Sequence, residues 1–247
     1  MRILVCIDDT DNWESRGTGE LASALVEFVE SSGWGSASYI TRHQLLVHPD
    51  IPYTSHNSSM AFFADIRPDY LGKFTSYAAE FLTHESAEGS DPGLCIVDIE
   101  RLESADRLID FGAQAKKVVL TMNDAYGLAR ALDIHLSEHG GTGQGVIGAL
   151  AGAGLRLGGD DGRLRGKLEF DTVDGRVSVA QLLNHPYIDA VRSVDGHVPS
   201  AAESVQLQDK VKTVLLGGQS VLLVEKNDSF ENTGLWQNLS RKNLKSY

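Results

Sequence analysis

Hydrophobic and polar positions along the chain follow two different periods, which predict alternating strands and helices. The opening run Met1-Arg2-Ile3-Leu4-Val5-Cys6-Ile7 is almost wholly apolar and predicts a buried strand. From there to residue 97 the pattern predicts a strand, a helix, two strands, a helix and a strand, at residues 1–7, 20–29, 36–47, 58–66, 70–82 and 94–97. This order is the split βαβ, or ferredoxin-like, pattern.

The rest of the chain divides into a helical part and a part with short strands. Helical spacing and a short apolar run predict three helices and one strand, at residues 104–111, 123–136 and 145–153 and at residues 118–120. Short apolar runs separated by Gly and Asp then predict strands at residues 164–170, 176–179, 212–216 and 221–224.

Together these elements predict an α/β (α+β) fold in two domains. The first, residues 1–160, would hold a ferredoxin-like β-α-β-β-α-β unit followed by a helical glycine-rich segment. The second, residues 161–247, would be a small mostly β module with a C-terminal tail.

Composition is typical of a soluble globular chain. The 247 residues are 42% hydrophobic and 23% charged. No apolar run approaches the roughly 18 residues of a spanning helix, and the start lacks a signal-peptide pattern. We therefore expect a cytoplasmic protein without a membrane partner. Cys6 and Cys95 lie in apolar, strand-like runs and are interpreted as core residues rather than as a disulfide or zinc site.

The net charge of −12 argues against a broad nucleic-acid surface. Non-specific binding to nucleic acids depends on Lys and Arg side chains that neutralise phosphates. Two local clusters of basic residues remain, and solvated surface is the favoured interpretation of both: Arg163, Arg165 and Lys167, and Arg241, Lys242 and Lys245.

The first candidate site directly follows the first strand, as Asp8-Asp9-Thr10-Asp11. Hard cations such as Mg²⁺ are held by one or two carboxylates together with nucleotide phosphates, so the cluster indicates a metal–nucleotide site. The alternative is structural, because Asp also caps helices and closes turns. Three like charges this close repel one another unless a cation or hydrogen bonds compensate them, which favours the metal.

The second candidate is the glycine-rich run from Gly140 to Gly148, which leads into a predicted helix. Backbone N–H groups at such a helix start can meet phosphate oxygens. The run contains Gly143-x-Gly145-x-x-Gly148, but a helix rather than a strand is predicted before it, so it does not meet the dinucleotide-binding pattern. A flexible hinge with close helix packing is the alternative interpretation.

The third candidate lies around the predicted hairpin of residues 41–59, which is rich in histidines and hydroxyls. Such histidines are more often surface or core residues than metal ligands. Arg42, His56 and Asn57 would nevertheless be good phosphate or sugar donors if they faced the acidic loop.

These three segments together resemble a known family, the archaeal tRNA(Ile) agmatidine synthetases. Members of that family use ATP to join agmatine to a cytidine of the tRNA anticodon. The resemblance rests on three motifs in the family's order and approximate spacing: Ile7-Asp8-Asp9-Thr10-Asp11, the His48 to Tyr53 element with its Ile-Pro-Tyr, and the run from Gly145 to Ala151. They fall in the family's kinase-like and ferredoxin-like portion.

The resemblance implies a role for each candidate residue. Asp8, Asp9 and Asp11 would hold Mg²⁺ during phosphoryl transfer. The threonine that becomes phosphorylated in the family corresponds to Thr18. The candidate catalytic residues are thus Asp8, Asp9, Asp11 and Thr18. The candidate ATP-binding residues are Thr10, Arg42, Asn57, Gly143, Gly145 and Gly148.

The sequence also departs from the family. Two distant cysteines cannot build the family's four-ligand zinc ribbon. The family's Arg-Gly-Asn-Gly appears here as Ser55-His56-Asn57-Ser58, in which Asn57 alone matches.

The resulting hypothesis is a stand-alone ATP- and Mg²⁺-dependent enzyme that phosphorylates an oxygen of a nucleoside or small molecule. The alternatives are a non-catalytic nucleotide-binding or regulatory module and an RNA-binding protein. The acceptor and the oligomeric state stay open, and the charge disfavours tRNA as a partner.

Overall fold

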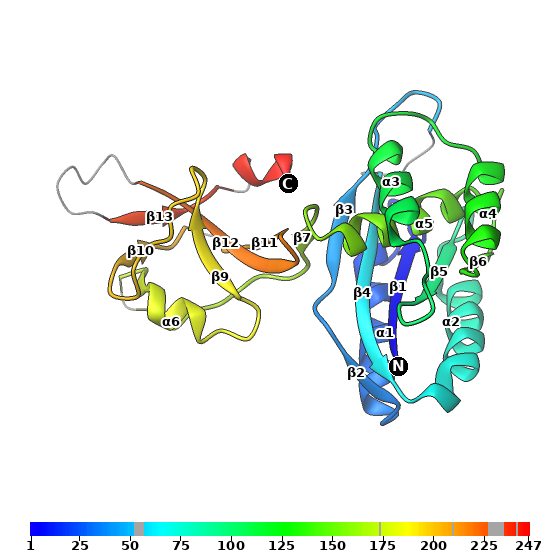
Figure 1. The fold of residues 1–247 in the computed structure, drawn as a ribbon, viewed down its shortest axis with the longest axis horizontal. Coiled ribbons are helices and arrows are strands. Elements are labelled where there is room, and N and C mark those ends of the chain that lie inside the picture. Colours follow the sequence, from blue (N-terminus) through cyan, green and yellow to red (C-terminus); the bar gives the residue numbers. More distant parts are fainter. Residues whose placement is uncertain (52–56, 173, 209, 227–234, 241) are drawn as a thin grey trace. The chain divides into compact units, whose positions relative to one another are not determined.

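The computed structural model describes residues 1–51, 57–172, 174–208, 210–226, 235–240 and 242–247 (Figure 1). Close contacts within the chain group these residues into two compact units, Met1–Gly158 and Gly159–Tyr247. Within the described residues, no helix is both long enough and apolar enough to cross a bilayer.

The first unit is built on an antiparallel sheet. Its strands are β1 (Arg2–Asp8), β2 (Gly35–Ala37), β3 (Thr41–Gln44), β4 (Ser58–Ile66), β5 (Gly93–Asp98) and β6 (His135–Glu138). They lie in the order β6-β5-β1-β4-β3, and β2 also pairs with β4. The predicted unit had four strands, which correspond to β1, β3 (with β2), β4 and β5. They lie side by side in the order β5-β1-β4-β3, which confirms the ferredoxin-like prediction.

Two helices cover one face of this sheet through large side chains. They are α1 (Thr18–Ser31) and α2 (Leu71–Glu85), the latter preceded by the 3₁₀ turn η1 (Pro68–Tyr70). Alternate residues of β1 point to this side, where they join a cluster of fully buried residues from both helices, such as Leu25 and Phe74.

Three further helices cover the opposite face: α3 (Ala105–Ala115), α4 (Met122–Ala131) and α5 (Gly145–Gly158). Helix α5 is buried from Gly145 to Arg156 except at Ile147, and most of these residues are Gly or Ala. With so little side chain between them, helix and sheet backbones approach closely. A Cβ atom at Gly152 would lie 2.0 Å from Ser59 Oγ of β4.

Two predictions of local structure in this unit differ from the observed strands. Residues 118–120 form no strand; they lie in the loop after α3, with Val118 and Val119 49% and 44% exposed. The strand expected at residues 36–47 is divided into β2 and β3.

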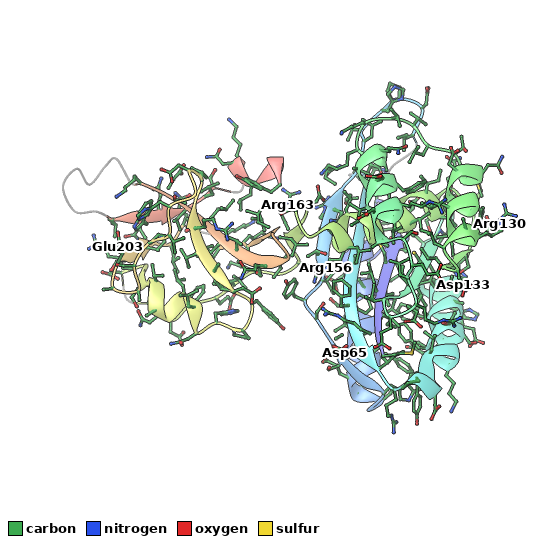
Figure 2. The ribbon with its side chains drawn as sticks, viewed as in Figure 1. Asp65, Arg130, Asp133, Arg156, Arg163 and Glu203 are labelled. Carbon is green, nitrogen blue, oxygen red and sulfur yellow. The ribbon has the colours of Figure 1, made fainter. Side chains whose placement is uncertain are left out.

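A third difference concerns the helix expected at residues 123–136, which ends at Ala131. Asp133, labelled in Figure 2, ends the helical run because it adopts a left-handed conformation, with φ 54°. Its last positions begin β6 instead, in which Leu136 points to the core and His135 does not. After Asp133, side chains therefore point alternately toward and away from the core, as in a strand, and no longer follow helical spacing.

The second unit is mostly β. Its elements are β7 (Arg163–Leu164), β8 (Arg176–Ser178), α6 (Val179–Leu183), β9 (Ala190–Ser193), β10 (Ser204–Gln206), β11 (Val214–Leu216), β12 (Gln219–Lys226), β13 (Trp236–Asn238) and the 3₁₀ turn η3 (Asn243–Ser246). The strand order is β7-β11-β12-β13-β10-β8, and β9 pairs with β12 in parallel. The Trp236 indole donates a 2.9 Å hydrogen bond to Glu203.

Three of the four strands predicted in this unit are shorter in the structure, the strand expected at residues 221–224 is longer, as β12, and several elements were not predicted. Residues 164–170 keep strand pairing only at β7 and at the isolated bridge between Leu168 and Val211. Val179 begins α6 because Ser178 caps that helix with Gln181 in a reciprocal capping box. Strands β9, β10 and β13 have three or four residues each, too few for a clear alternation.

Candidate functional site

A cleft forms in the first unit where three strand ends meet. Because β1 runs antiparallel to both neighbours, its carboxyl end lies beside the amino ends of β4 and β5. In register, Ile7 faces Met60 of β4 and Asp8 faces Gly93 of β5. The N-terminus of α5 reaches the same place, since Gly148 contacts Asp8.

The cleft has a volume of about 250 Å³ and is lined by two kinds of residue. Most of the candidate residues are among them: Asp8, Asp9, Asp11, Thr18, Arg42, Asn57, Gly145 and Gly148. The apolar lining residues, here called the apolar wall, include Leu45, Ile51, Val118, Val119, Leu120 and Ile147. Such a combination suits a ligand with a charged part and an apolar part.

Two of the three aspartates hold their carboxyl groups in unfavourable surroundings. Burial raises the pKa of Asp8 well above its usual value, and the charges of Asp9 and Asp11 raise it further. The pKa of Asp9 is raised to about 6, first by burial and then by the charges of Asp91 and Asp11. A bound cation would relieve this repulsion.

Asp11 contacts the start of α1 and also lines the cleft. Its Oδ2 accepts a 3.4 Å hydrogen bond from the backbone N–H of Thr18, the first residue of α1. Asp11 therefore supports the helix start and lines the cleft as well. Thr18 is 5% exposed and also lines the cleft, so the two residues lie side by side there.

Glycine lets α5 approach the first aspartate closely. A Cβ atom on Gly148 would lie only 1.6 Å from Asp8 Oδ2, so the buried Asp8 side chain or the helix would have to shift to accommodate it. The absence of a side chain at position 148 thus lets the first turn of α5 rest against the acidic loop.

The hairpin donors lie in the cleft but already have partners. Arg42 Nε donates a 2.9 Å hydrogen bond to Ser58 Oγ, and Asn57 Nδ2 donates a 2.6 Å bond to the Leu46 carbonyl. Asn57 therefore fixes the local backbone through its amide nitrogen. His56 and the Pro52-Tyr53 dipeptide lie outside the described residues.

Two candidate residues are not brought into the cleft. Thr10 is fully buried, and its hydroxyl has no hydrogen-bond partner among the described residues. Gly143, with φ 81°, is buried behind the loop, where a Cβ atom would lie 1.8 Å from the Glu138 carboxylate. Gly143 thus shapes the turn before α5 rather than its surface.

Asp91 and the apolar wall were both missed by sequence reasoning. Asp91 is 8% exposed and lies just before β5, where its negative charge contributes to the raised pKa of Asp9. The usable signal was the strand order, since an antiparallel neighbour brings its start beside the end of β1. The apolar wall was hidden because Val118, Val119 and Leu120 resemble a strand.

The aspartates fit Mg²⁺ as partial rather than complete ligands. Within the part of the chain that the structure describes, no three His, Cys, Asp or Glu residues are arranged to hold a metal ion by themselves. Mg²⁺ usually takes one or two protein carboxylates and completes its shell with phosphates and water. The buried Asp8 carboxylate, repelled by its neighbours, suits that incomplete set.

The amino-acid sequence of the chain is similar to that of a known enzyme. The chain is 32% identical over 162 residues to the tRNA(Ile) 2-agmatinylcytidine synthetase of Archaeoglobus fulgidus, a match to 64% of this chain and 36% of the synthetase. The chain is homologous to the tRNA(Ile) agmatidine synthetases. No family model matches the chain.

Solved structures extend the likeness to the fold. The crystal structure of a tRNA fluorescent labeling enzyme shares 31% identity and a TM-score of 0.55 over 62% of this chain and 36% of its own. A synthetase structure in complex with its tRNA(Ile), AMPCPP and agmatine shares 25% identity and a TM-score of 0.54 over 82% of this chain and 51% of its own. The chain thus spans about a third to a half of the length of the synthetases that it matches.

Proposed function

We propose that the chain is an ATP- and Mg²⁺-dependent enzyme that activates an oxygen atom of an acceptor by phosphorylation. One observation carries the proposal: the acidic loop after β1 and the N-terminus of α5 face each other in the same cleft. Carboxylates attract a cation, and a helix N-terminus attracts phosphate, so the two together suit a metal-bound nucleotide.

The triphosphate would lie along the first turn of α5, at Gly145 and Gly148. Both residues line the cleft, and neither has a side chain that would keep phosphate oxygens from the backbone. Arg42 lines the same cleft and adds a positive charge. The base would pack against the apolar wall around Val118 and Val119.

Asp8, Asp9 and Asp11 are the residues that would hold Mg²⁺. The ion, when bound, offsets negative charge on the phosphates during transfer. The protein residues then bind and orient the reactants. An acceptor oxygen attacks the γ-phosphorus, the bond to the ADP oxygen breaks, and an amine can later displace the new phosphate from the acceptor. Thr18, beside Asp11, is the candidate hydroxyl for contacting or accepting phosphate.

The homologous synthetases favour a nucleoside as the acceptor and an amine as the nucleophile. Their name gives 2-agmatinylcytidine in an isoleucine tRNA as the product, and one of their structures holds that tRNA, AMPCPP and agmatine. The present chain carries a net charge of −12 and matches only part of their length, so we propose the nucleoside class without assigning tRNA.

A thermal-shift titration with nucleotide tests the binding step. ATP with Mg²⁺ should raise the melting temperature of the wild-type chain, because a ligand that binds the native state stabilises it by mass action. Asp8→Asn should abolish the shift. Asp65→Asn, an exposed aspartate of β4 (Figure 2), is the matched control and should keep it. No shift with ATP or GTP in the wild type would refute the proposal.

A non-catalytic nucleotide-binding module is the second candidate. It is favoured by Asn57, whose amide nitrogen is engaged by the backbone, and by Ser55 in place of the family's arginine. Release of ADP, AMP or phosphate separates the two candidates. Turnover that disappears in Asp8→Asn supports the enzyme, whereas tight binding without turnover supports the module.

A further inference from the structure

Asp91 lies next to both the acidic loop (residues 8–11) and the glycine-rich loop (residues 140–145), although it does not line the cleft itself. It lies just before β5, buried to 8% exposure, between the acidic loop and the glycine-rich loop. On one side, it lies close enough to Asp9 for its negative charge to raise the pKa of the Asp9 carboxyl group. On the other side, its carboxylate accepts two hydrogen bonds from Thr142.

The contacts with Thr142 use both carboxylate oxygens. The Thr142 hydroxyl donates to Asp91 Oδ2 at 2.6 Å, and the Thr142 backbone N–H donates to Oδ1. Hydrogen bonds to an ionised acceptor are about twice as strong as neutral ones. Two of them from one residue fix the position and the rotation of the loop at Thr142.

The packing around Asp91 shows that the glycine-rich loop fits closely against it. Gly141 has φ 57°, and a Cβ atom there would lie 1.8 Å from Asp91 Oδ1. A Cβ atom on Gly145, the first residue of α5, would lie 1.9 Å from the Asp91 carbonyl oxygen. The loop therefore contacts Asp91 at both ends.

We infer that Asp91 is a positioning residue: it holds the loop of residues 140–145 so that the first turn of α5 faces Asp8 and Asp9 across the cleft. This inference rests on the proposed function, since it assigns to Asp91 the placement of the phosphate-binding backbone. Asp91 acts through Thr142 and the helix start, without contacting the nucleotide.

Calorimetric titration of the full chain with ATP and Mg²⁺ tests this role. Asp91→Asn keeps the size of the side chain but loses its charge, and it should weaken ATP binding about tenfold, as expected for a lost charge-assisted hydrogen bond. Thr142→Val should weaken binding in the same direction, and Thr142→Ser should leave it unchanged. The double variant should bind no worse than Asp91→Asn alone, because both changes break one interaction.

Two further measurements separate positioning from general destabilisation and from failure of the proposed function. Leu25→Ala, in α1 on the opposite face of the sheet, should lower the melting temperature while the folded protein keeps its ATP affinity. Hydrogen exchange of the nucleotide-free protein should be faster at residues 140–146 in Asp91→Asn and unchanged there in Leu25→Ala.

The outcomes are distinct. If the wild type binds ATP and Asp91→Asn binds it equally well, the inference is wrong and the proposed function stands. If the wild type binds no nucleotide, the proposed function fails, and exchange decides whether Asp91 holds the loop. Unchanged exchange at residues 140–146 in Asp91→Asn overturns the inference in either case.

Discussion

The two faces of the first unit's sheet are built in opposite ways. On the α1 and α2 face, large side chains fill the space between helices and strands, and aromatic rings such as Phe28 and Tyr77 stack beside them. On the α5 face, Gly and Ala leave almost no such space, and the helix backbone rests on the strands. The first arrangement suits stability, whereas the second brings the N-terminal turn of α5 into contact with the Asp8 carboxylate.

Burial alone therefore does not distinguish a core helix from a helix whose N-terminus lines a cleft. Helices α1 and α5 are both well buried, but α1 has the ordinary apolar stripe of a core helix. Helix α5 is buried on nearly all sides and has small residues on the side that meets the sheet. Substitutions on the two faces should therefore separate loss of stability from loss of nucleotide binding.

The largest loss of stability should come from Phe74→Ala on the α2 face. Phe74 is fully buried, and removal of a buried phenyl group costs about 3–5 kcal/mol of unfolding free energy. Urea denaturation measures the loss. The protein that remains folded should bind ATP normally, and a large drop in its affinity would show that the two faces are not independent.

A smaller loss of stability, with the full loss of binding, is expected from Gly148→Ala. The added methyl group would overlap Asp8 Oδ2, and overpacking of this kind costs about 1–3 kcal/mol. ATP with Mg²⁺ should then produce no thermal shift. Preserved nucleotide binding in this variant would place the site elsewhere.

The pH dependence of stability should show the cost of the acidic loop in nucleotide-free, EDTA-treated protein. The pKa of Asp9 is about 6 in the folded state and near 4 in the unfolded chain, so the folded state binds its proton more tightly. The stabilisation of the folded state by protonation of Asp9 is fully present below about pH 4 and is lost as the pH rises through about 6. Asp9→Asn should reduce this decline without abolishing it, because the pKa of Asp8 is raised as well, and urea denaturation across that pH range can measure the difference.

The smallest effect should come from Gly127→Ala in α4, the matched control for Gly148. A Cβ atom at this exposed helical position meets nothing within 4 Å. The change should raise stability by roughly 0.5–1 kcal/mol, because Ala is the better helix former. A loss of ATP affinity here would argue that any glycine substitution perturbs the site.

Local patterns predicted several elements of the first unit closely. Strand β4 has the expected bounds, Ser58–Ile66, and β1 and α2 lie within a few residues of theirs. The aspartate loop was also found from sequence, because three charges directly after an apolar run are visible without a structure. The roles of its residues in binding metal and nucleotide stay predictions.

What sequence could not supply depended on tertiary neighbours. Asp91 became a candidate only once β5 was known to lie beside β1, and no local pattern distinguishes it from an ordinary loop aspartate. Val118 and Val119 have strand-like composition but no sheet to join, so they line the cleft instead. The left-handed turn at Asp133 depends on a backbone conformation that helix periodicity does not report.

The contact between Gly148 and Asp8 also sets the order in which the site is completed during synthesis. About 140 residues separate the two partners, and long-range contacts of this kind form late because loop closure must come first. As the chain leaves the ribosome, the acidic loop emerges long before α5. Nucleotide binding therefore should appear only when translation has passed α5, which makes ATP binding by stalled nascent chains a direct reporter of when the first unit finishes folding.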